Sequence, residues 1–368
     1  MKKLIAISVV FALVAGVAFA VDLGGTVIGT VKVIVADSSG SVTGDAGFGR
    51  IRIEGGGEVA DGKFGGWLRF EPTGGTWTIG GDHIAGNAWW KPIDQLKLGI
   101  GGNPDGIWGK EGTAGWMFYQ SISDTGVVDQ SNVWGGGFGG DLMLRSKSWD
   151  PGYCGAFFGG WGDQRLFIEI SPVDMVGINI AIPFFKTGDI KDIFMGSIAQ
   201  VDLNMSFGNV AFTYVGSDAN IKNSQIFGFF SLTAIDNLQL DFGLGANFLG
   251  TDPIKLGIAV KYGRDTWGIK FRTMYAIPTR SDQAFGMLFD ILPYFVINEN
   301  FRAFISAGLN IASIDDITHG AGWHVNPYIE VGEEWGAKFG AGIKVWAESN
   351  FTNPTVKFEI PIALIVSF

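Results

Sequence analysis

The chain lacks a second cysteine, and after residue 20 it lacks any uninterrupted apolar run long enough for a membrane-spanning helix. The lone Cys154 excludes an internal disulfide framework. Charged residues are also few, at 17%, although the mean hydropathy is +0.25 and aromatic residues reach 14%. Apolar residues are therefore distributed along the chain in short segments.

Histidine is scarce as well, which limits the case for an enzyme. Only three are present. His83 follows Asp82 and His319 lies close to Asp315, and an Asp-His pair at an outer rim can activate water. A solvated polar loop has the same composition, and no second pair converges with either. We predict that the chain is not an enzyme and holds no metal or cofactor.

The first twenty residues differ from the rest and carry the pattern of a signal peptide. Lys2 and Lys3 precede an uncharged apolar stretch that ends at Ala18-Phe19-Ala20. Small residues at Ala18 and Ala20 are typical of a signal-peptidase site. An N-terminal membrane anchor is the alternative, but the apolar run is short and Asp22 follows at once. We predict a signal peptide at 1–20 and a single mature domain at 21–368.

The mature chain is acidic and poor in helix formers. Without the two lysines of the signal it holds 24 Lys+Arg (26 − 2) against 36 Asp+Glu, a formal charge of −12. Such a chain is a poor partner for nucleic acid. The full sequence contains 57 glycines, 30 phenylalanines and 13 tryptophans, a composition that favours strands whose small inward residues lie opposite outward aromatic ones.

Alternation with a period of two recurs along the chain and predicts strands. In the last thirteen residues, "VKFEIPIALIVSF", every second residue is apolar. This apolar row consists of Phe358, Ile360, Ile362, Leu364, Val366 and Phe368. "LQLDFGLGANF" and "WGIKFRTMY" repeat the pattern, with Leu240, Phe242 and Trp267 on the apolar face and Asp241 and Lys270 on the other. Each segment has about the length of a tilted bilayer-crossing strand.

Short and long connections alternate between these segments. The short ones contain Asp94, Asp174, Asp236 and Asn298, residues that favour tight turns, and the long ones are polar. We predict strands near 24–36, 46–57, 62–71, 84–91, 95–102, 164–170, 176–185, 193–206, 209–216, 225–235, 238–249, 254–263, 267–277, 284–297, 300–312, 323–332, 335–346 and 355–368. Eighteen strands, with sixteen as the alternative, predict an all-β, transmembrane, antiparallel up-and-down β-barrel.

Residues 103–163 do not fit this rhythm. The segment is long and rich in Gly, Trp and Phe. We predict a long extracellular or lumen-folded loop, with one additional hairpin as the alternative.

The signal, the alternating strands, the "AWWKPIDQLKLGIGGN" hairpin and the terminal phenylalanine resemble bacterial outer-membrane porin-type barrels. The Gly- and Trp-rich N-terminal half looks most like spirochaete outer-membrane barrels. In such barrels the terminal aromatic strand is the signal that the barrel-assembly machinery recognises. The resemblance implies the same role for the apolar row that ends at Phe368.

The alternation also predicts which charged residues face the lumen. The inward basic residues are Arg50, Arg52, Arg69, Lys97, Arg165, Lys255, Lys261, Lys270, Arg272, Arg302, Lys338 and Lys344. The inward acids are fewer, chiefly Glu54, Glu169, Asp241 and Glu330, and most other acids fall in connections. These patterns predict a basic inner wall. The alternative is that inward charges merely pair with one another.

The prediction is therefore an outer-membrane porin for passive diffusion of small hydrophilic solutes, with mild anion selectivity. Its partners would be outer-membrane lipid, the barrel-assembly machinery and the solutes themselves. Two alternatives are a transporter of hydrophobic substrates and a surface adhesin or structural barrel with a closed lumen. Whether the barrels associate as a homo-oligomer stays open at this point.

Deleting Phe368 is expected to lower the amount of folded, heat-modifiable protein in outer membranes, because the outward apolar row would lose its last aromatic residue. The measurement is a gel-shift assay of membranes with and without heating. An unchanged amount of the folded species would contradict the assembly role.

Overall fold

The computed structural model describes a chain built from strands. The described residues are 22–37, 40, 42–70, 84–102, 165–183, 197–216, 224–247, 254–311, 313–315, 321–332, 337–348 and 355–367. Its strands are β1 (Asp22–Asp37), β2 (Val42–Val59), β3 (Phe64–Phe70), β4 (Ile84–Ile93), β5 (Leu96–Gly102), β6 (Arg165–Val173), β7 (Val176–Pro183), β8 (Ile198–Met205), β9 (Gly208–Val215), β10 (Gln225–Ile235), β11 (Leu238–Asn247), β12 (Ile254–Gly263), β13 (Trp267–Ile277), β14 (Gly286–Asn298), β15 (Phe301–Ile311), β16 (Ala321–Gly332), β17 (Ala337–Gly342), β18 (Lys344–Glu348) and β19 (Thr355–Ser367). Across these ranges no helix is long and apolar enough to cross a membrane.

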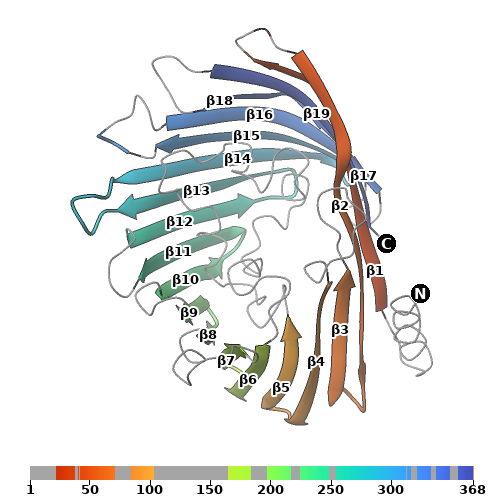
Figure 1. Ribbon diagram of the computed structural model, residues 1–368, viewed down its shortest axis with the longest axis vertical. Coiled ribbons are helices and arrows are strands. Elements are labelled where there is room, and N and C mark those ends of the chain that lie inside the picture. Colours follow the sequence, from red (N-terminus) through yellow and green to blue (C-terminus); the bar gives the residue numbers. More distant parts are fainter. Residues whose placement is uncertain are drawn as a thin grey trace.

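All strands belong to one antiparallel up-and-down sheet that curves round as a barrel (Figure 1). Each strand pairs with the next one along the chain from β1 to β16. Both β17 and β18 pair with β16 on one side and β19 on the other. Finally, β19 pairs with β1, from Thr26 opposite Ser367 to Asp37 opposite Lys357. Every strand therefore has a hydrogen-bonded neighbour on each side.

The prediction of eighteen strands is confirmed with one local difference. The nineteen strands occupy eighteen positions (19 − 1), because β17 and β18 share one place between β16 and β19. The sequence pattern predicted one strand at 335–346, whereas the structure interrupts it at Ile343. There the Ile343 amide donates to the carbonyl oxygen of Pro327 in β16 (2.9 Å). Pro327 has no amide hydrogen for regular pairing, so the strand breaks opposite it.

The two faces of the sheet alternate as predicted. In β11, Phe242 and Leu244 are 41% and 53% exposed, whereas Asp241, directly before Phe242, is 3% exposed. In β13, Trp267 is 40% exposed and Lys270 is 4% exposed. The outer face is therefore apolar and open, and the inner face carries buried polar groups.

The expected match of inward small residues with outward aromatic ones is wrong in several places. Trp89 and Phe167 lie on the inner face, each lying across a glycine of the adjoining strand. A Cβ on Gly65 would lie 2.2 Å from the Trp89 ring, and a Cβ on Gly99 would lie 2.0 Å from the Phe167 ring. These glycines leave the space in which the inward rings lie flat along the wall.

The predicted tight turns are confirmed at 94–95, 174–175, 236–237 and 299–300. Because the strands alternate in direction, all these turns lie at one end of the barrel, which we call the turn end. A salt bridge joins two neighbouring turns there, between Lys63 Nζ and Asp94 Oδ1 (2.8 Å). The hydrogen bond and charge of Lys63 hold the pKa of the Asp94 carboxyl below its usual value.

The prediction for 103–163 falls outside the described residues, as do the signal residues Ala18 and Ala20, the terminal Phe368, and His83, His319 and Cys154. These expectations stay predictions.

Position 101 in β5 requires glycine for two reasons. Its φ is 129°, and an added Cβ would lie 2.1 Å from the Gly86 carbonyl oxygen in β4. Gly101→Ala is therefore expected to lower the free energy of unfolding by more than about 1 to 3 kcal/mol, the cost of the backbone conformation alone. Equilibrium urea unfolding in detergent micelles, followed by tryptophan fluorescence, measures this loss.

The matched control is Gly228→Ala, because the nearest atom to its added Cβ is Phe212 Cε1 at 3.7 Å. Its effect should stay within about 0.5 kcal/mol. Equal losses at Gly101 and Gly228 would show that the close approach of β4 and β5 is wrong.

Candidate functional site: the inner wall of the barrel

The inner face of the sheet gathers most of the charged strand side chains that the structure describes. On this face the basic residues are Lys91, Lys97, Lys261, Lys270, Arg302 and Lys357, and the acids are Glu58, Glu169, Asp202, Asp241 and Glu330. Six basic residues against five acids leave one excess positive charge. The bases and the acids differ more in how deeply they are buried than in their number.

Asp202 in β8 is the centre of a buried hydrogen-bond network. Its two carboxylate oxygens accept from Asn179 Nδ2 (3.0 Å) and Gln200 Nε2 (2.6 Å). Gln200 Oε1 in turn accepts from Thr213 Oγ1 (3.0 Å). Asp202 is 5% exposed, so its charge is held by the wall rather than presented to the lumen.

A second network surrounds Asp241 in β11. Its Oδ1 accepts from Ser231 Oγ (2.5 Å), and its carboxylate accepts from Gln239 Nε2 (2.9 and 3.1 Å). Ser231 lies directly opposite Asp241 on β10, and Gln239 lies two residues before it on the same face. This acid is likewise enclosed by its neighbours.

Two lysines lie opposite each other on β12 and β13. Lys261 pairs in register with Lys270. Lys270 is 4% exposed, whereas Lys261 is exposed. Like charges at opposed positions of a sheet repel, so the Lys261 ammonium extends into open space beside its neighbour.

The inner face of β16 is a row of buried polar and aromatic residues. His324, Asn326, Tyr328 and Glu330 are at most 3% exposed. His324 Nε2 lies 3.0 Å from Ser306 Oγ on β15. The row was not part of the sequence-based site, although its period of two in "HVNPYIE" is a signal that finds it.

Aromatic stacking reinforces this row. The Tyr328 ring stacks on Phe304 of β15, with centroids 4.7 Å apart and planes 3° from parallel. On β18, opposite His324, Trp346 lies under the Lys357 ammonium of β19, 4.2 Å from the ring centroid. This part of the wall is therefore tightly packed.

Lysine and aromatic side chains also combine where β4, β5 and β6 approach the turn end. The ammonium groups of Lys91 and Lys97 lie 4.8 and 4.9 Å from the centroid of the Trp89 ring. Lys97 Nζ also lies 3.3 Å from Glu169 Oε1 and 5.7 Å from the Phe167 ring. Both partners of this salt bridge are about one quarter exposed.

The structure describes the side chains of four predicted lumen residues, Lys97, Lys261, Lys270 and Arg302. For the others it describes the backbone only, in β2 for Arg50 and Arg52, β3 for Arg69, β6 for Arg165, β12 for Lys255, β13 for Arg272, β17 for Lys338 and β18 for Lys344. Lys91, Lys357 and Asp202 were missing from the predicted inner wall, although the alternation of their strands places them there.

The apolar row that was predicted to be the assembly signal lies along β19. Ile360 and Ile362 are partly exposed, and Leu364 and Val366 are 50% and 36% exposed. Pro361, on the other face, pairs with Lys32 of β1, where the register shifts. The row thus lies beside the seam between the first and last strands.

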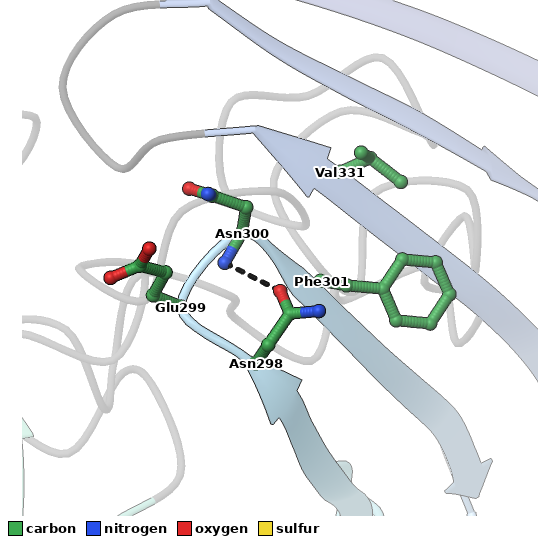
Figure 2. A pocket seen from close by; sticks show the side chains of 5 residues that line it. All are labelled: Asn298, Glu299, Asn300, Phe301 and Val331. Carbon is green, nitrogen blue, oxygen red and sulfur yellow. Dashed lines mark hydrogen bonds between the residues drawn. The ribbon is translucent and has the colours of Figure 1, made fainter.

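A hollow of about 600 Å³ lies at the β14–β15 turn (Figure 2). Its lining residues are Asn298, Glu299, Asn300, Phe301 and Val331. The Asn300 amide donates to Asn298 Oδ1 (2.9 Å), which fixes the turn. The hollow is open to its surroundings and has no converging pair of charged groups among its lining residues, so the inner wall is the stronger candidate.

No family model matches the chain, and no curated protein matches it. Solved structures do resemble it. The anion-selective porin from Comamonas acidovorans has a TM-score of 0.54 at 10% identity, over 95% of this chain and 99% of the porin. A triple mutant of Rhodopseudomonas blastica porin has a TM-score of 0.48 at 14% identity, over 95% of this chain and all of that chain.

The likeness to the Comamonas structure supports the fold, which is that of a porin-type barrel. At 10% identity it transfers no residue roles. This neighbour comes from Comamonas and not from a spirochaete. The spirochaete resemblance therefore stays a prediction.

Asp202→Ala is expected to lower the free energy of unfolding by about 2 to 4 kcal/mol, because it leaves the buried amides of Asn179 and Gln200 without their charged acceptor. Urea unfolding in micelles measures the loss. Lys261→Ala is the control, since Lys261 is exposed, and should change stability by less than about 0.5 kcal/mol. If Asp202→Ala left the free energy of unfolding unchanged, the network would not stabilise the wall.

Proposed function

We propose that this protein is an outer-membrane porin through which small hydrophilic solutes diffuse passively. An apolar outer face and a polar inner face on one barrel fit lipid outside and water inside. Eighteen strand positions are also enough for an aqueous channel, because barrels of 16 to 18 strands leave an open interior.

The outer face carries aromatic pairs near the strand ends, which supports a membrane location. Toward the turn end, Phe64 stacks on Trp90 (6.3 Å between centroids) and Tyr262 packs against Trp267 (5.5 Å). Toward the other end, Tyr275 contacts Phe289 edge-on (6.1 Å). Aromatic girdles of this kind lie at the two interfaces of outer-membrane barrels.

Burial of the acids is the observation that carries the proposed anion preference. Among the inner-wall side chains that the structure describes, Asp202, Asp241 and Glu330 are at most 5% exposed, whereas only one base, Lys270, is buried to that degree. The accessible groups of this described set are five bases, Lys91, Lys97, Lys261, Arg302 and Lys357, and two acids, Glu58 and Glu169. Permeating ions respond most to charges that face the lumen, because a narrow, low-dielectric channel focuses their field.

The remaining partners follow from the same proposal. Outer-membrane lipid would cover the outer face, and the barrel-assembly machinery would recognise the β19 row. Further copies of the chain would associate, if at all, through the outer face. A hydrophobic-substrate transporter would need a continuous apolar track inside the barrel, whereas charged side chains such as Lys97, Lys261 and Arg302 lie among the aromatic rings of the described inner wall.

The porin is expected to favour chloride over potassium. The measurement is the reversal potential of the purified protein in a planar bilayer under a potassium chloride gradient. Lys261→Glu with Arg302→Glu should shift the permeability ratio toward potassium, because both side chains lie on the accessible inner wall near the turn end.

The control is Arg280→Glu in the connection at 278–285, where Arg280 pairs with Asp282. The Arg280 guanidinium holds the pKa of the Asp282 carboxyl below its usual value, and both residues are well exposed. Screening should make this variant's shift smaller. Cation selectivity of the unaltered protein would contradict the anion preference, and absence of conductance would favour the adhesin or structural barrel.

A further inference from the structure

Two positively charged side chains lie close to the Trp89 ring on the inner wall. Lys91 on β4 and Lys97 on β5 both place their ammonium groups over this one indole ring, at 4.8 and 4.9 Å. A ring face attracts a cation, but it does not cancel the repulsion between two of them. Each lysine therefore needs an anion of its own.

Four other charged groups near this ring are already engaged in two ion pairs. Lys97 has Glu169 at 3.3 Å, and Lys63 has Asp94 at 2.8 Å. For Lys91, no carboxylate of the described residues lies within ion-pair distance. Its closest described contact is with the Trp89 ring. Its charge acts at longer range on the Asp94 carboxylate, which is already paired with Lys63. Among the described residues, the Lys91 ammonium therefore has no carboxylate of its own.

Glu58 is another acid of the inner wall close to Trp89, and its side chain points toward the turn at 60–63. It lies on β2 opposite Gly65, which in turn lies opposite Trp89. Its Oε2 lies 3.2 Å from the position of a Cβ on Gly62, in the turn at 60–63. Glu58 thus leans over that turn.

The ring beside Lys91 is held in place and partly open. The space of a Cβ on Gly65 is filled by Trp89, and the space of a Cβ on Gly99 is filled by Phe167. Phe167 is 2% exposed and supports the wall, whereas Trp89 is only partly buried. A fixed apolar surface therefore borders an ammonium group that has no carboxylate of the described residues within ion-pair distance.

We propose that Lys91 and Trp89 form a binding site for a small organic monocarboxylate with a flat hydrocarbon group. The carboxylate binds the Lys91 ammonium, and the hydrocarbon lies on the exposed part of the Trp89 ring. One unmatched charge favours a monoanion, and the apolar surface favours benzoate over acetate. This inference rests on the proposed porin function and names a solute class for it.

The test is current through the unmodified porin in a planar bilayer, in potassium chloride, with sodium benzoate or sodium acetate added to each side in turn. Benzoate should reduce the current reversibly, at concentrations about tenfold below those that acetate requires. Lys91→Gln should raise the half-blocking benzoate concentration by about tenfold, the loss of one charge-assisted contact. Trp89→Leu should remove most of the preference for benzoate over acetate.

Arg264→Gln is the matched control, since it removes one positive charge at the same end from an exposed turn, where Arg264 Nε donates to the Tyr262 hydroxyl oxygen (2.7 Å). It should leave the benzoate block within about twofold of the unmodified porin, because a screened surface charge contributes little. Equal effects of Lys91→Gln and Arg264→Gln would overturn the site, and so would equal block by benzoate and acetate. Conductance without any block would overturn this inference and leave the porin proposal intact. A protein without conductance would overturn both.

Discussion

The pairing of β19 with β1 is the constraint on which the rest of the structure depends. A strand in the middle of a sheet satisfies its backbone amides and carbonyls on both sides, whereas an edge strand leaves one row unpaired. Here ten register pairs join the first and last strands, from Thr26 and Ser367 to Asp37 and Lys357. An unpaired row would be costly in lipid, because no water is present there to bond it.

Two-sided pairing leaves the side chains as the only groups that face outward or inward. Because neighbouring residues of a strand point to opposite faces, each strand must supply one set of side chains for the outer face and another set for the inner face. Phe242 and Leu244 on the outside, and Asp241 with its hydrogen-bond donors on the inside, are the clearest case. Among the described side chains, the Asp202 and Asp241 carboxylates are enclosed by donors in the wall, whereas Lys261 is exposed. The proposed anion preference rests on this difference in burial.

Much of the fold could be predicted because its signals are local. Period-two alternation and the turn residues at Asp94, Asp174 and Asp236 located the strands and gave eighteen positions. The break at Ile343 could not be predicted, because it depends on Pro327 in the neighbouring strand. Signals within one strand do not show how that strand aligns with its neighbour.

The candidate site was less accessible to sequence for the same reason. Alternation alone assigns Lys97 and Lys261 to the inner face, but it does not show that Asp202 is enclosed by Asn179 and Gln200, or that Lys91 and Lys97 meet over one ring. Those contacts join different strands, and they follow from the alignment of each strand with the next.

The central claim is that the outer face meets lipid and the inner face meets water. Spin labels at single cysteines placed one at a time from position 256 to 261 of β12, with Cys154 replaced by serine, test it directly in lipid vesicles. The account predicts that labels at 256, 258 and 260 collide mainly with dissolved oxygen, and that labels at 257, 259 and 261 do not share this preference and collide with a water-soluble nickel complex wherever they are accessible. A pattern without this period of two, or with the two sets exchanged, would contradict it.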